Sequence, residues 1–576
     1  MKNSDIAAVF ENIADLLELK GENKFKIRAY SRAAQVISHL RQEMELMHEE
    51  GNDFRDIEGI GDAIAKKSVE LITTGKLKFY EDLKAEFPEG IINLLDVPGI
   101  GPKTAYRLST ELGVGSVEQL EQAIKDGRVA KLERMGEKTA ANILHAIGAF
   151  RRKDRRIPLG EALPAVEEVI AELAKVPGVR NLTAAGSLRR FKETVGDIDL
   201  MGTADNPETV IQVFVKLPQV RQVLSQGPTK ASVILPKGLQ ADLRMVEHAE
   251  FGSLLQHFTG SKEHNVALRT RTQAQGLSLS EYGITDVKTG EVKKFADEHS
   301  FYQYLGLQYI PPEIREDMGE IGLAAKNAIP ALVEIQNIRG DLHSHTTASD
   351  GMDSIEDMAK AAKSLGYEYL AITDHSSGRM IPADKKLDRV KRQTAEIKRI
   401  NGSSLGIYLL DGVEVDIKAD GSLDLPDEVL AGLDIVIGSV HSSFLQDRAQ
   451  MTRRIIGAIE DPNIDIIAHP TCRKIGEREP VDVDLEALFR AAAEHGKALE
   501  INAMPDRMDL KDLHAYRARE LGVILSIGTD SHATNHLALM KFGIGVARRA
   551  WCQPEDILNT RSLKDVLHFL KRDKVG

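Results

Sequence analysis

Two aspartates stand two positions apart in the string GDIDLMG, within a stretch whose composition predicts a β-strand. Because side chains alternate along a strand, Asp197 and Asp199 project from one face, and Ile198 and Leu200 from the other. Adjacent carboxylates repel each other, and a divalent cation between them removes that repulsion. A pair of Mg²⁺ or Mn²⁺ ions held in this way can clamp the attacking and the leaving oxygen of a phosphoryl transfer. That chemistry needs a third carboxylate, and the candidate is Asp242 in QADLRMV, on another predicted strand.

The residues before this pair favour a triphosphate as the substrate. The string GSLRRFKETVGDIDL places a small turn at Gly186, the hydroxyl of Ser187 and two arginines, among them Arg190, shortly before the carboxylates. These groups suit a triphosphate held beside the metal ions. A second pair with the same spacing, Asp482 and Asp484 in PVDVDLEA, has no such neighbours, and we interpret it as the start of a helix.

Histidines form the second concentration of reactive side chains, since ten of the 17 lie after residue 340. A single histidine is more often a surface or core residue than a metal ligand. Here histidines and carboxylates follow the ends of successive apolar runs: His343, His345, Asp350, His375, Glu414, His441, His469, Asp530 and His532. Imidazole and carboxylate groups in this number suit two or three Zn²⁺, Mn²⁺ or Fe ions, which accept nitrogen ligands more readily than Mg²⁺ does.

The apolar runs that carry these residues predict the fold of this part of the chain. After Arg339, seven runs end as DLHSH, YLAITDH, YLLDGVEVD, IVIGSVHSS, DIIAHP, ALEINA and VILSIGTDSH, and helix-like segments separate them. Such alternation predicts parallel strands, which in a closed barrel deliver their C-terminal ends to one face. We therefore expect a distorted (β/α)7 barrel over residues 337–576, preceded by a linker over residues 321–336.

The rest of the chain predicts a multidomain protein with two further kinds of domain. Residues 157–320 mix strands with helices, as an α+β domain does. Residues 1–90 and 91–156 predict short amphipathic helices joined by turns that contain glycine.

A repeat lies within these two helical regions. Gly-Ile-Gly occurs at Gly59 and Gly61 and again at Gly99 and Gly101, each time before a helix with alanine on its packing face. The glycines permit a tight turn that exposes N–H groups at the helix start, where they can bind a DNA phosphate. This is the pattern of the helix-hairpin-helix motif, although such a turn can also merely redirect the chain.

Length and composition exclude several classes of protein. At 576 residues the chain is too long for a single hydrophobic core, which stops growing near roughly 250–300 residues. It has no apolar stretch of membrane-spanning length, no apolar core of a signal peptide at its N-terminus and only two cysteines, too few for a disulfide framework. From these features we expect a cytoplasmic protein without membrane contacts. The net charge of −12 counts mildly against a nucleic-acid partner, so any DNA contact must come from local geometry.

The string GSLRRFKETVGDIDL resembles the palm signature of the family X DNA polymerases, the DNA polymerase beta group of nucleotidyltransferases. The resemblance implies a triphosphate-binding group and a metal-binding triad, which are Gly186, Ser187 and Arg190, and Asp197, Asp199 and Asp242, respectively. It also implies dNTPs and gapped or primer-template DNA as partners of a nucleoid-associated monomer. Together with the N-terminal repeats, it covers roughly the first 320 residues.

Downstream, HFTGSKEHNVALR resembles the fingers segment of the same family. The resemblance implies that Phe258 and Gly260 pack beneath the incoming sugar and reject ribose. It further implies that Asn265 contacts the incoming base in the minor groove and that Arg269 contacts the templating strand. The family usually has tyrosine before that phenylalanine, whereas this chain has His257, which puts sugar discrimination and primer-terminus contacts in question.

The N-terminal part also resembles the lyase domain of this family, which removes a 5′-deoxyribose phosphate through a Schiff-base lysine. Lys67 stands where that nucleophile would be, and Lys26 matches a phosphate-binding position. A neighbouring lysine of the family is Ala63 here. Lyase activity is therefore a hypothesis, and the alternative is that Lys67 is a surface lysine on a helix.

The strings HSHTTASDG, TDHS, GVEVD, VHSS, AHP and TDSH resemble the PHP (polymerase and histidinol phosphatase) family over about residues 337–576. All nine ligand positions that this resemblance implies are filled, so we expect an active metal-dependent phosphoesterase. In a polymerase context it implies 3′-5′ exonuclease activity, with abasic-site cleavage as a further expectation. The pattern carries little information about the substrate.

We therefore expect a gap-filling repair polymerase with a PHP exonuclease. The first alternative is a PHP nuclease or phosphatase whose polymerase half serves mainly as a DNA-binding platform. The intact aspartate triad argues against it, while His257 leaves it open. The second is a non-enzymatic scaffold that bridges DNA through two decayed sites, which the many retained catalytic-type residues disfavour.

Overall fold

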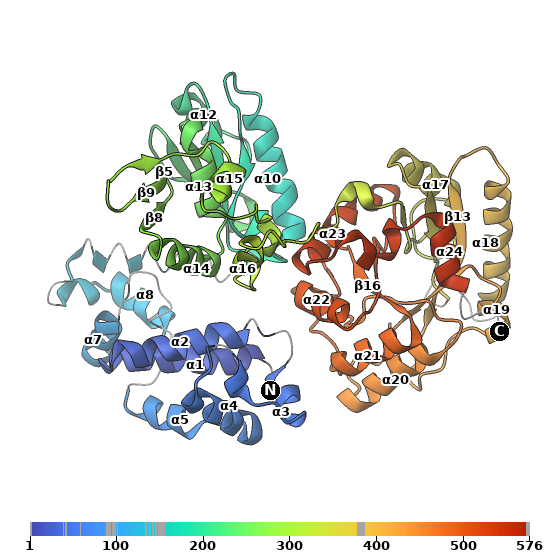
Figure 1. Cartoon of the computed structure of the whole chain (residues 1–576), viewed down its shortest axis with the longest axis horizontal. Helices are drawn as coiled ribbons and strands as arrows, with labels where there is room; N and C mark the ends of the chain where they lie inside the picture. Colours follow the sequence, from blue (N-terminus) through green and yellow to red (C-terminus); the bar gives the residue numbers. More distant parts are fainter. Residues whose placement is uncertain are drawn as a thin grey trace. The chain divides into compact units, whose positions relative to one another are not determined.

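Asp197 and Asp199 lie on a strand of a central mixed sheet in the second of two compact units, Met1–Arg156 and Ile157–Gly576. These findings come from a computed structural model (Figure 1). It describes residues 3–38, 40, 43–57, 59–87, 94, 100, 102–132, 135–137, 139–140, 143–144, 147, 156–376 and 386–571. The second glycine pair of the repeat, Gly99 and Gly101, lies outside the described residues.

The first unit is helical, as its amphipathic periodicity predicts. Its helices are α1 (Asn3–Leu19), α2 (Lys24–Ser38), α3 (Met44–Glu49), α4 (Asp62–Thr74), α5 (Lys78–Ala85), α7 (Pro102–Leu112) and α8 (Val117–Lys125). Helices α1 and α2 pack against each other (Figure 1), and the ring of Phe10 lies 6.1 Å from that of Tyr30 in the core. Tyr30 stacks in turn on Phe79 of α5, which ties three helices together.

The second unit begins with an α+β region around a five-stranded sheet of order β2-β4-β7-β6-β5. Its strands are β2 (Thr183–Ala184), β4 (Asp197–Thr203), β7 (Gln240–Val246), β6 (Lys230–Ile234) and β5 (Gln222–Gln226). A two-stranded ribbon pairs β1 (Ile157–Pro158) with β3 (Thr194–Val195), and a three-stranded sheet holds β8 (Leu277–Ser280), β9 (Gly283–Asp286) and β10 (Val292–Lys293). The helices are α10 (Leu159–Leu173), α11 (Gly186–Arg189), α12 (Pro207–Phe214), α13 (Phe251–Thr259), α14 (Lys262–Gln273), α15 (Glu298–Tyr304) and α16 (Glu320–Ala324).

The burial of β4 and β7 follows the alternation that the sequence predicts. Ile198 and Leu200 of β4 and Leu243 of β7 are fully buried in the core. Asp197 is exposed and Asp199 half-buried, because they project from the opposite face. One face of this sheet is therefore the core, and the other carries the carboxylates.

The barrel has seven strands, all parallel and in chain order. They are β11 (Gly340–Asp341), β12 (Tyr369–Ile372), β13 (Tyr408–Asp416), β14 (Ile435–Ser439), β15 (Ile466–Ile467), β16 (Ala498–Asn502) and β17 (Leu525–Gly528). A parallel bridge between Ser344 and Ser531 joins the first and last strands just beyond their ends, so the sheet nearly closes. The predicted (β/α)7 barrel is confirmed.

Helices surround these strands (Figure 1). They are α17 (Ile355–Ser364), α18 (Lys386–Asn401), α19 (Asp427–Leu430), α20 (Arg448–Glu460), α21 (Leu485–His495), α22 (Asp512–Glu520), α23 (Met540–Arg549) and α24 (Leu563–Lys571). The carboxylate of Asp484 accepts a hydrogen bond from the Ala487 N–H and caps α21, so the second Asp-x-Asp string does start a helix.

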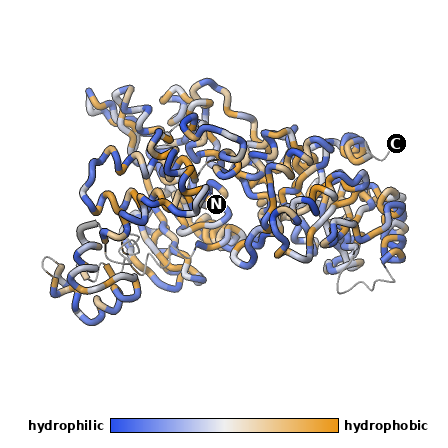
Figure 2. The backbone as a smooth tube through the Cα atoms, turned by 90° about the horizontal axis from the view of Figure 1, so that it is seen from below, coloured by the Kyte–Doolittle hydropathy of each residue, from blue (hydrophilic) through white to orange (hydrophobic). Residues whose placement is uncertain are grey.

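Hydrophilic and hydrophobic segments alternate along the coloured part of the tube in Figure 2. Accordingly, within the described ranges we find no helix that combines the length and the apolar character needed to cross a membrane.

Candidate active sites

The first candidate site is the carboxylate face of strands β4 and β7. These strands are parallel neighbours, and their register sets Asp199 directly opposite Asp242 and Asp197 opposite Gln240. The Gln240 amide nitrogen donates to both Asp242 oxygens, at 3.3 and 3.1 Å, which orients that carboxylate. The register thus brings the three predicted aspartates to one sheet face.

The carboxylate of Asp199 lies half-buried beside the other two. Burial, with the charges of Asp197 and Asp242, raises the pKa of Asp199 to about 7. Three carboxylates at one place hinder each other's ionisation, and a divalent cation would relieve that repulsion. The donor set therefore fits hard cations such as Mg²⁺ or Mn²⁺.

The residues predicted to hold a triphosphate adjoin these carboxylates. Gly186 has φ +61°, and a Cβ atom there would lie 3.0 Å from Asp199 Oδ2, so glycine lets the turn approach the carboxylate. Ser187 follows on α11. The Arg190 guanidinium donates to the Thr259 carbonyl, and its Nε donates to Glu316 Oε1 at 3.1 Å. Arg190 thus links the turn at Gly186 to the segment around Gly260.

The segment predicted to meet the nucleotide sugar and base lies at the junction of α13 and α14. A Cβ atom on Gly260 would lie 3.3 Å from the Arg190 guanidinium, so this turn and Arg190 are neighbours. Asn265 accepts from the Gln256 amide at 2.9 Å and donates to the His257 carbonyl at 2.8 Å, which fixes its orientation.

The aromatic side chain of this segment has a partner that the sequence did not predict. The Arg244 guanidinium, on β7, lies 4.6 Å from the centre of the Phe258 ring. His257 packs edge-on against the same ring at 5.1 Å, and burial lowers the pKa of His257. Arg269 lies half-buried on α14, and its charge also contributes to the lowered pKa of His257.

The second candidate site lies at the C-terminal rim of the barrel. Glu414, at the end of β13, is fully buried at its centre, and five histidines approach its carboxylate. The nitrogen-to-oxygen distances are 3.6 Å for His343 and His345, 2.6 Å for His375, and 3.3 Å for His441 and His469.

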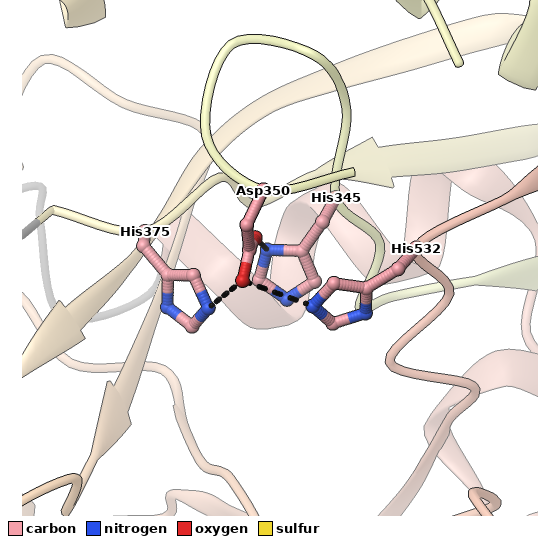
Figure 3. A group of neighbouring side chains, drawn as sticks. All are labelled: His345, Asp350, His375 and His532. Atoms are coloured by element: carbon pink, nitrogen blue, oxygen red, sulfur yellow. Dashed lines mark ion pairs between the residues drawn. The ribbon is translucent and has the colours of Figure 1, made fainter. Parts of the chain in front are cut away.

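Three groups of ligand atoms, each within 4.8 Å of one another, form on this rim in the part of the chain that the structure describes. They are His345, Asp350, His375 and His532; His343, His345 and Asp530; and His375, Glu414 and His441. In the first group the His375 and His532 imidazoles each lie 3.4 Å from the Asp350 carboxylate (Figure 3). All nine predicted residues therefore converge, with His469 joining through Glu414.

The chemistry of this donor set fits transition-metal cations. The Nδ1 atom of His345 is buried without a hydrogen-bond partner among the described residues, and it faces Asp350 at 3.9 Å. Burial, with the nearby Arg507, lowers the pKa of His469 to about 4, so its imidazole is neutral and able to ligate. Shared ligands such as His345 and His375 suit ions held close together.

Two carboxylates that the sequence analysis missed orient these histidines. Glu500 accepts from His343 Nδ1 at 2.7 Å, and its other oxygen accepts from the backbone N–H of His469 at 2.7 Å. Asp416 lies 2.7 Å from His441 Nδ1. The contacts to His343 and His441 turn the second nitrogen of each imidazole toward the centre, as carboxylates next to metal-bound histidines do. Their position in the strand-end strings ALEINA and GVEVD was a usable signal.

A pocket of about 430 Å³ opens over the rim and is lined by Arg507, which no motif predicted. The Arg507 side chain is 14% exposed, lies 3.6 Å from Asp530 and has one terminal nitrogen without a hydrogen-bond partner among the described residues. A guanidinium placed in this way can bind a phosphate oxygen.

We expect Arg507→Met to slow phosphodiester hydrolysis about 10- to 100-fold, because a charge-assisted hydrogen bond contributes about 1.5–3 kcal/mol. The rate on bis-p-nitrophenyl phosphate with Mn²⁺ measures this, and Arg490→Met, at an arginine that pairs with Glu486 on α21, is the matched control. An unchanged rate for Arg507→Met would exclude a phosphate contact.

The remaining predicted residues lie in the first unit. Gly59 has φ +98°, and Gly61 caps the start of α4, so the turn before this helix has the predicted form. Asp62 follows at once and pairs with Lys66 at 3.0 Å. The Lys67 and Lys26 ammonium groups lie 4.9 and 5.7 Å from the centre of one aromatic ring, that of Phe79, which places the two lysines on the same side of this unit.

Family models match four segments of the chain. They are a helix-hairpin-helix domain over residues 1–77, a SAM-like helix-hairpin-helix tandem over 91–148, the DNA polymerase beta thumb over 254–316 and the PHP domain over 341–504. The segment that we assigned to the fingers is thus matched by the thumb model.

Curated relatives match the chain either over its whole length or over about 40% of it. It is 40% identical to the DNA polymerase/3'-5' exonuclease PolX of Bacillus subtilis over 575 residues, which covers 100% of both chains. Over 250 residues, 41% of this chain and 96% of the relative, it is 32% identical to a probable phosphatase of Thermoanaerobacter sp.. A probable phosphatase of Shewanella sp. is 32% identical over 240 residues, 40% of this chain and 90% of its own.

Proposed function

The chain belongs to the PolX group of family X DNA polymerases, which carry a PHP domain, and on this premise we propose that it fills gaps in DNA and trims 3′ ends. The observation that carries the proposal is the presence of two separate sets of metal-ligand side chains in one chain. One consists of carboxylates on a sheet face, and the other of histidines and carboxylates on a barrel rim.

In the proposed polymerase site, Asp197, Asp199 and Asp242 hold Mg²⁺ or Mn²⁺. These ions, when bound, neutralise developing charge on the transferred phosphoryl group. The Ser187 hydroxyl and the Arg190 guanidinium bind the triphosphate, and Gly186 lets the turn that carries them lie close to Asp199. Support comes from the register of β4 with β7 and from the close approach of the Gly186 turn to Asp199.

The segment after this site selects the nucleotide and meets the template. Phe258 and Gly260 pack beneath the sugar, Asn265 contacts the base in the minor groove, and Arg269 contacts the templating strand. His257 takes the place of the usual tyrosine, and its contact with Phe258 keeps an aromatic pair at this position.

In the proposed exonuclease site the nine rim residues hold two or three Zn²⁺, Mn²⁺ or Fe ions, which, when bound, supply a nucleophilic hydroxide and stabilise charge on the phosphate. Arg507 binds a phosphate oxygen beside them. The glycine turn at Gly59 and Gly61, and the second Gly-Ile-Gly string at Gly99 and Gly101, bind DNA backbone phosphates. The protein acts on DNA and dNTPs as a monomer.

A gap-filling assay tests the proposal. The full chain with a one-nucleotide gap, dNTPs and Mg²⁺ or Mn²⁺ is expected to add one nucleotide, and without dNTPs to shorten the primer from its 3′ end. EDTA is expected to stop both reactions. Failure of extension with continued shortening would favour the alternative, in which the polymerase half is a DNA-binding platform.

Lyase activity is a further part of the proposal, in which Lys67 forms the Schiff base. Borohydride treatment of the protein with an incised abasic-site DNA is expected to form a covalent adduct, because reduction fixes the imine. Lys67→Ala is expected to lose the adduct, and Lys66→Ala, its neighbour paired with Asp62, is the matched control. Equal trapping by the Lys67→Ala protein would remove Lys67 from this role.

A further inference from the structure

The palm turn that follows α11 docks on a barrel helix. Phe191 has φ +59° and packs against Phe542 of α23, with 6.0 Å between ring centres. A Cβ atom on Gly545 of α23 would lie 1.9 Å from Phe191 Cδ1, so only glycine leaves room for this ring. Glu193, two residues on, pairs with Arg473 of the barrel at 2.7 Å. The barrel therefore holds the segment just before the catalytic carboxylates.

A buried carboxylate extends this contact to Arg190. One oxygen of Glu316 accepts from Arg190 Nε at 3.1 Å and from the Arg549 guanidinium at 2.9 Å. The same Arg549 group donates to the Arg190 carbonyl at 2.7 Å. Arg549 ends α23, so a barrel residue contacts Arg190 both directly and through Glu316.

Arg549 is itself fixed on the barrel side. Its Nε and terminal nitrogen each lie 2.7 Å from the Asp512 carboxylate of α22. Burial alone would raise the pKa of Glu316, but the charges of Arg549, Lys192 and Arg190 outweigh it and lower this pKa to about 2. Glu316 is therefore ionised at neutral pH. The side chains of Asp512, Arg549, Glu316 and Arg190 thus contact one another in a row of alternating charge that has little exposure to water.

We infer that Arg549 of the barrel is a positioning residue of the polymerase reaction, which holds the Arg190 guanidinium, through Glu316, where it meets the nucleotide triphosphate. The inference rests on the proposed role of Arg190. Its geometric basis is that Arg190 lies between Glu316 and the Thr259–Gly260 turn, so a shift of Glu316 moves Arg190 relative to the sugar-binding turn. The exonuclease domain then serves nucleotide binding in addition to its own reaction.

Steady-state filling of a one-nucleotide gap with varied dTTP tests this inference on the full chain. Arg549→Met is expected to raise the KM for dTTP about 10-fold with a much smaller change in kcat, as loss of a supporting contact to a binding group does. Arg549→Lys is expected to restore part of the loss, because it keeps the charge but not the planar fork. Arg548→Met on the same helix, whose partner is Glu313, is the matched control.

Two further comparisons make the test decisive. The Arg549→Met/Arg190→Met protein is expected to match Arg190→Met alone, because Arg549 acts through Arg190. Exonuclease activity of each preparation is expected to stay unchanged, which separates positioning from general destabilisation. Should Arg549→Met fold poorly, Asp512→Asn, which weakens the barrel-side anchor of Arg549 by removing its negative charge, is expected to raise the same KM.

An unchanged KM in Arg549→Met, while Arg190→Met raises it, would overturn the inference and leave the proposed function intact. Additive effects in the double variant, or equal losses of polymerase and exonuclease activity, would also overturn it. An Arg190→Met protein with normal KM would instead reject the proposed role of Arg190, and this inference with it.

Discussion

Asp197→Ala is expected to lower the rate of nucleotide addition on gapped DNA about 1,000-fold or more, because loss of a metal ligand removes several kcal/mol of charge stabilisation and about 1.36 kcal/mol changes a rate tenfold. The exonuclease rate of the same protein is expected to stay close to that of the wild type. The register supports this separation, since Asp197 stands on β4 beside Asp199 and Asp242 and far along the chain from the nine rim residues. Single-turnover extension with Mg²⁺ measures the loss.

The chain supplies a matched control for this change. Asp482 belongs to the second Asp-x-Asp string, before helix α21, and its side chain is exposed, so Asp482→Ala is expected to leave extension unchanged. Extension that survives in Asp197→Ala would defeat the assignment of the polymerase site to this sheet face.

His343→Ala is expected to have the converse effect. His343 is buried on the barrel rim, where its Nε2 faces His345 at 3.1 Å and the Asp530 carboxylate at 3.7 Å, and Glu500 holds its other nitrogen. Loss of this imidazole removes a ligand from a shared site, so 3′-end removal is expected to fall about 1,000-fold or more. Gap filling by the same protein is expected to continue.

His495, exposed at the end of α21, provides the control, and His495→Ala is expected to degrade primers normally. Degradation that persists in His343→Ala, with a rate near that of the wild type, would show that a contaminating nuclease or another part of the chain carries the activity.

The barrel site was predictable because its signal is local in the sequence. Each ligand follows an apolar run, and strand ends of a parallel barrel meet at one face whatever the details of packing. The same holds for Asp197 and Asp199, whose alternation with Ile198 and Leu200 is visible along β4. The pairing of Asp199 with Asp242 was not local, and it rested on the need for a third carboxylate and on the family resemblance until the strand register supplied it.

Other parts of the sites were beyond sequence reasoning because tertiary packing decides them. Arg549 and Glu316 lie 233 positions apart, and their pairing depends on how the palm turn meets α23. Arg507 lies between β16 and α22, outside any recognisable sequence motif, and only the fold brings it to the pocket. Arg244 alternates with buried residues on β7, yet its contact with Phe258 requires α13 to cross that sheet face.

Anomalous diffraction from crystals of the full chain grown with Mn²⁺ tests most directly that two separate cation sites carry the two activities. The structure predicts manganese peaks in two places, one beside Asp197, Asp199 and Asp242 and the other within the rim of histidines around Glu414. Crystals soaked in ample manganese that show no peak at either place would contradict the account.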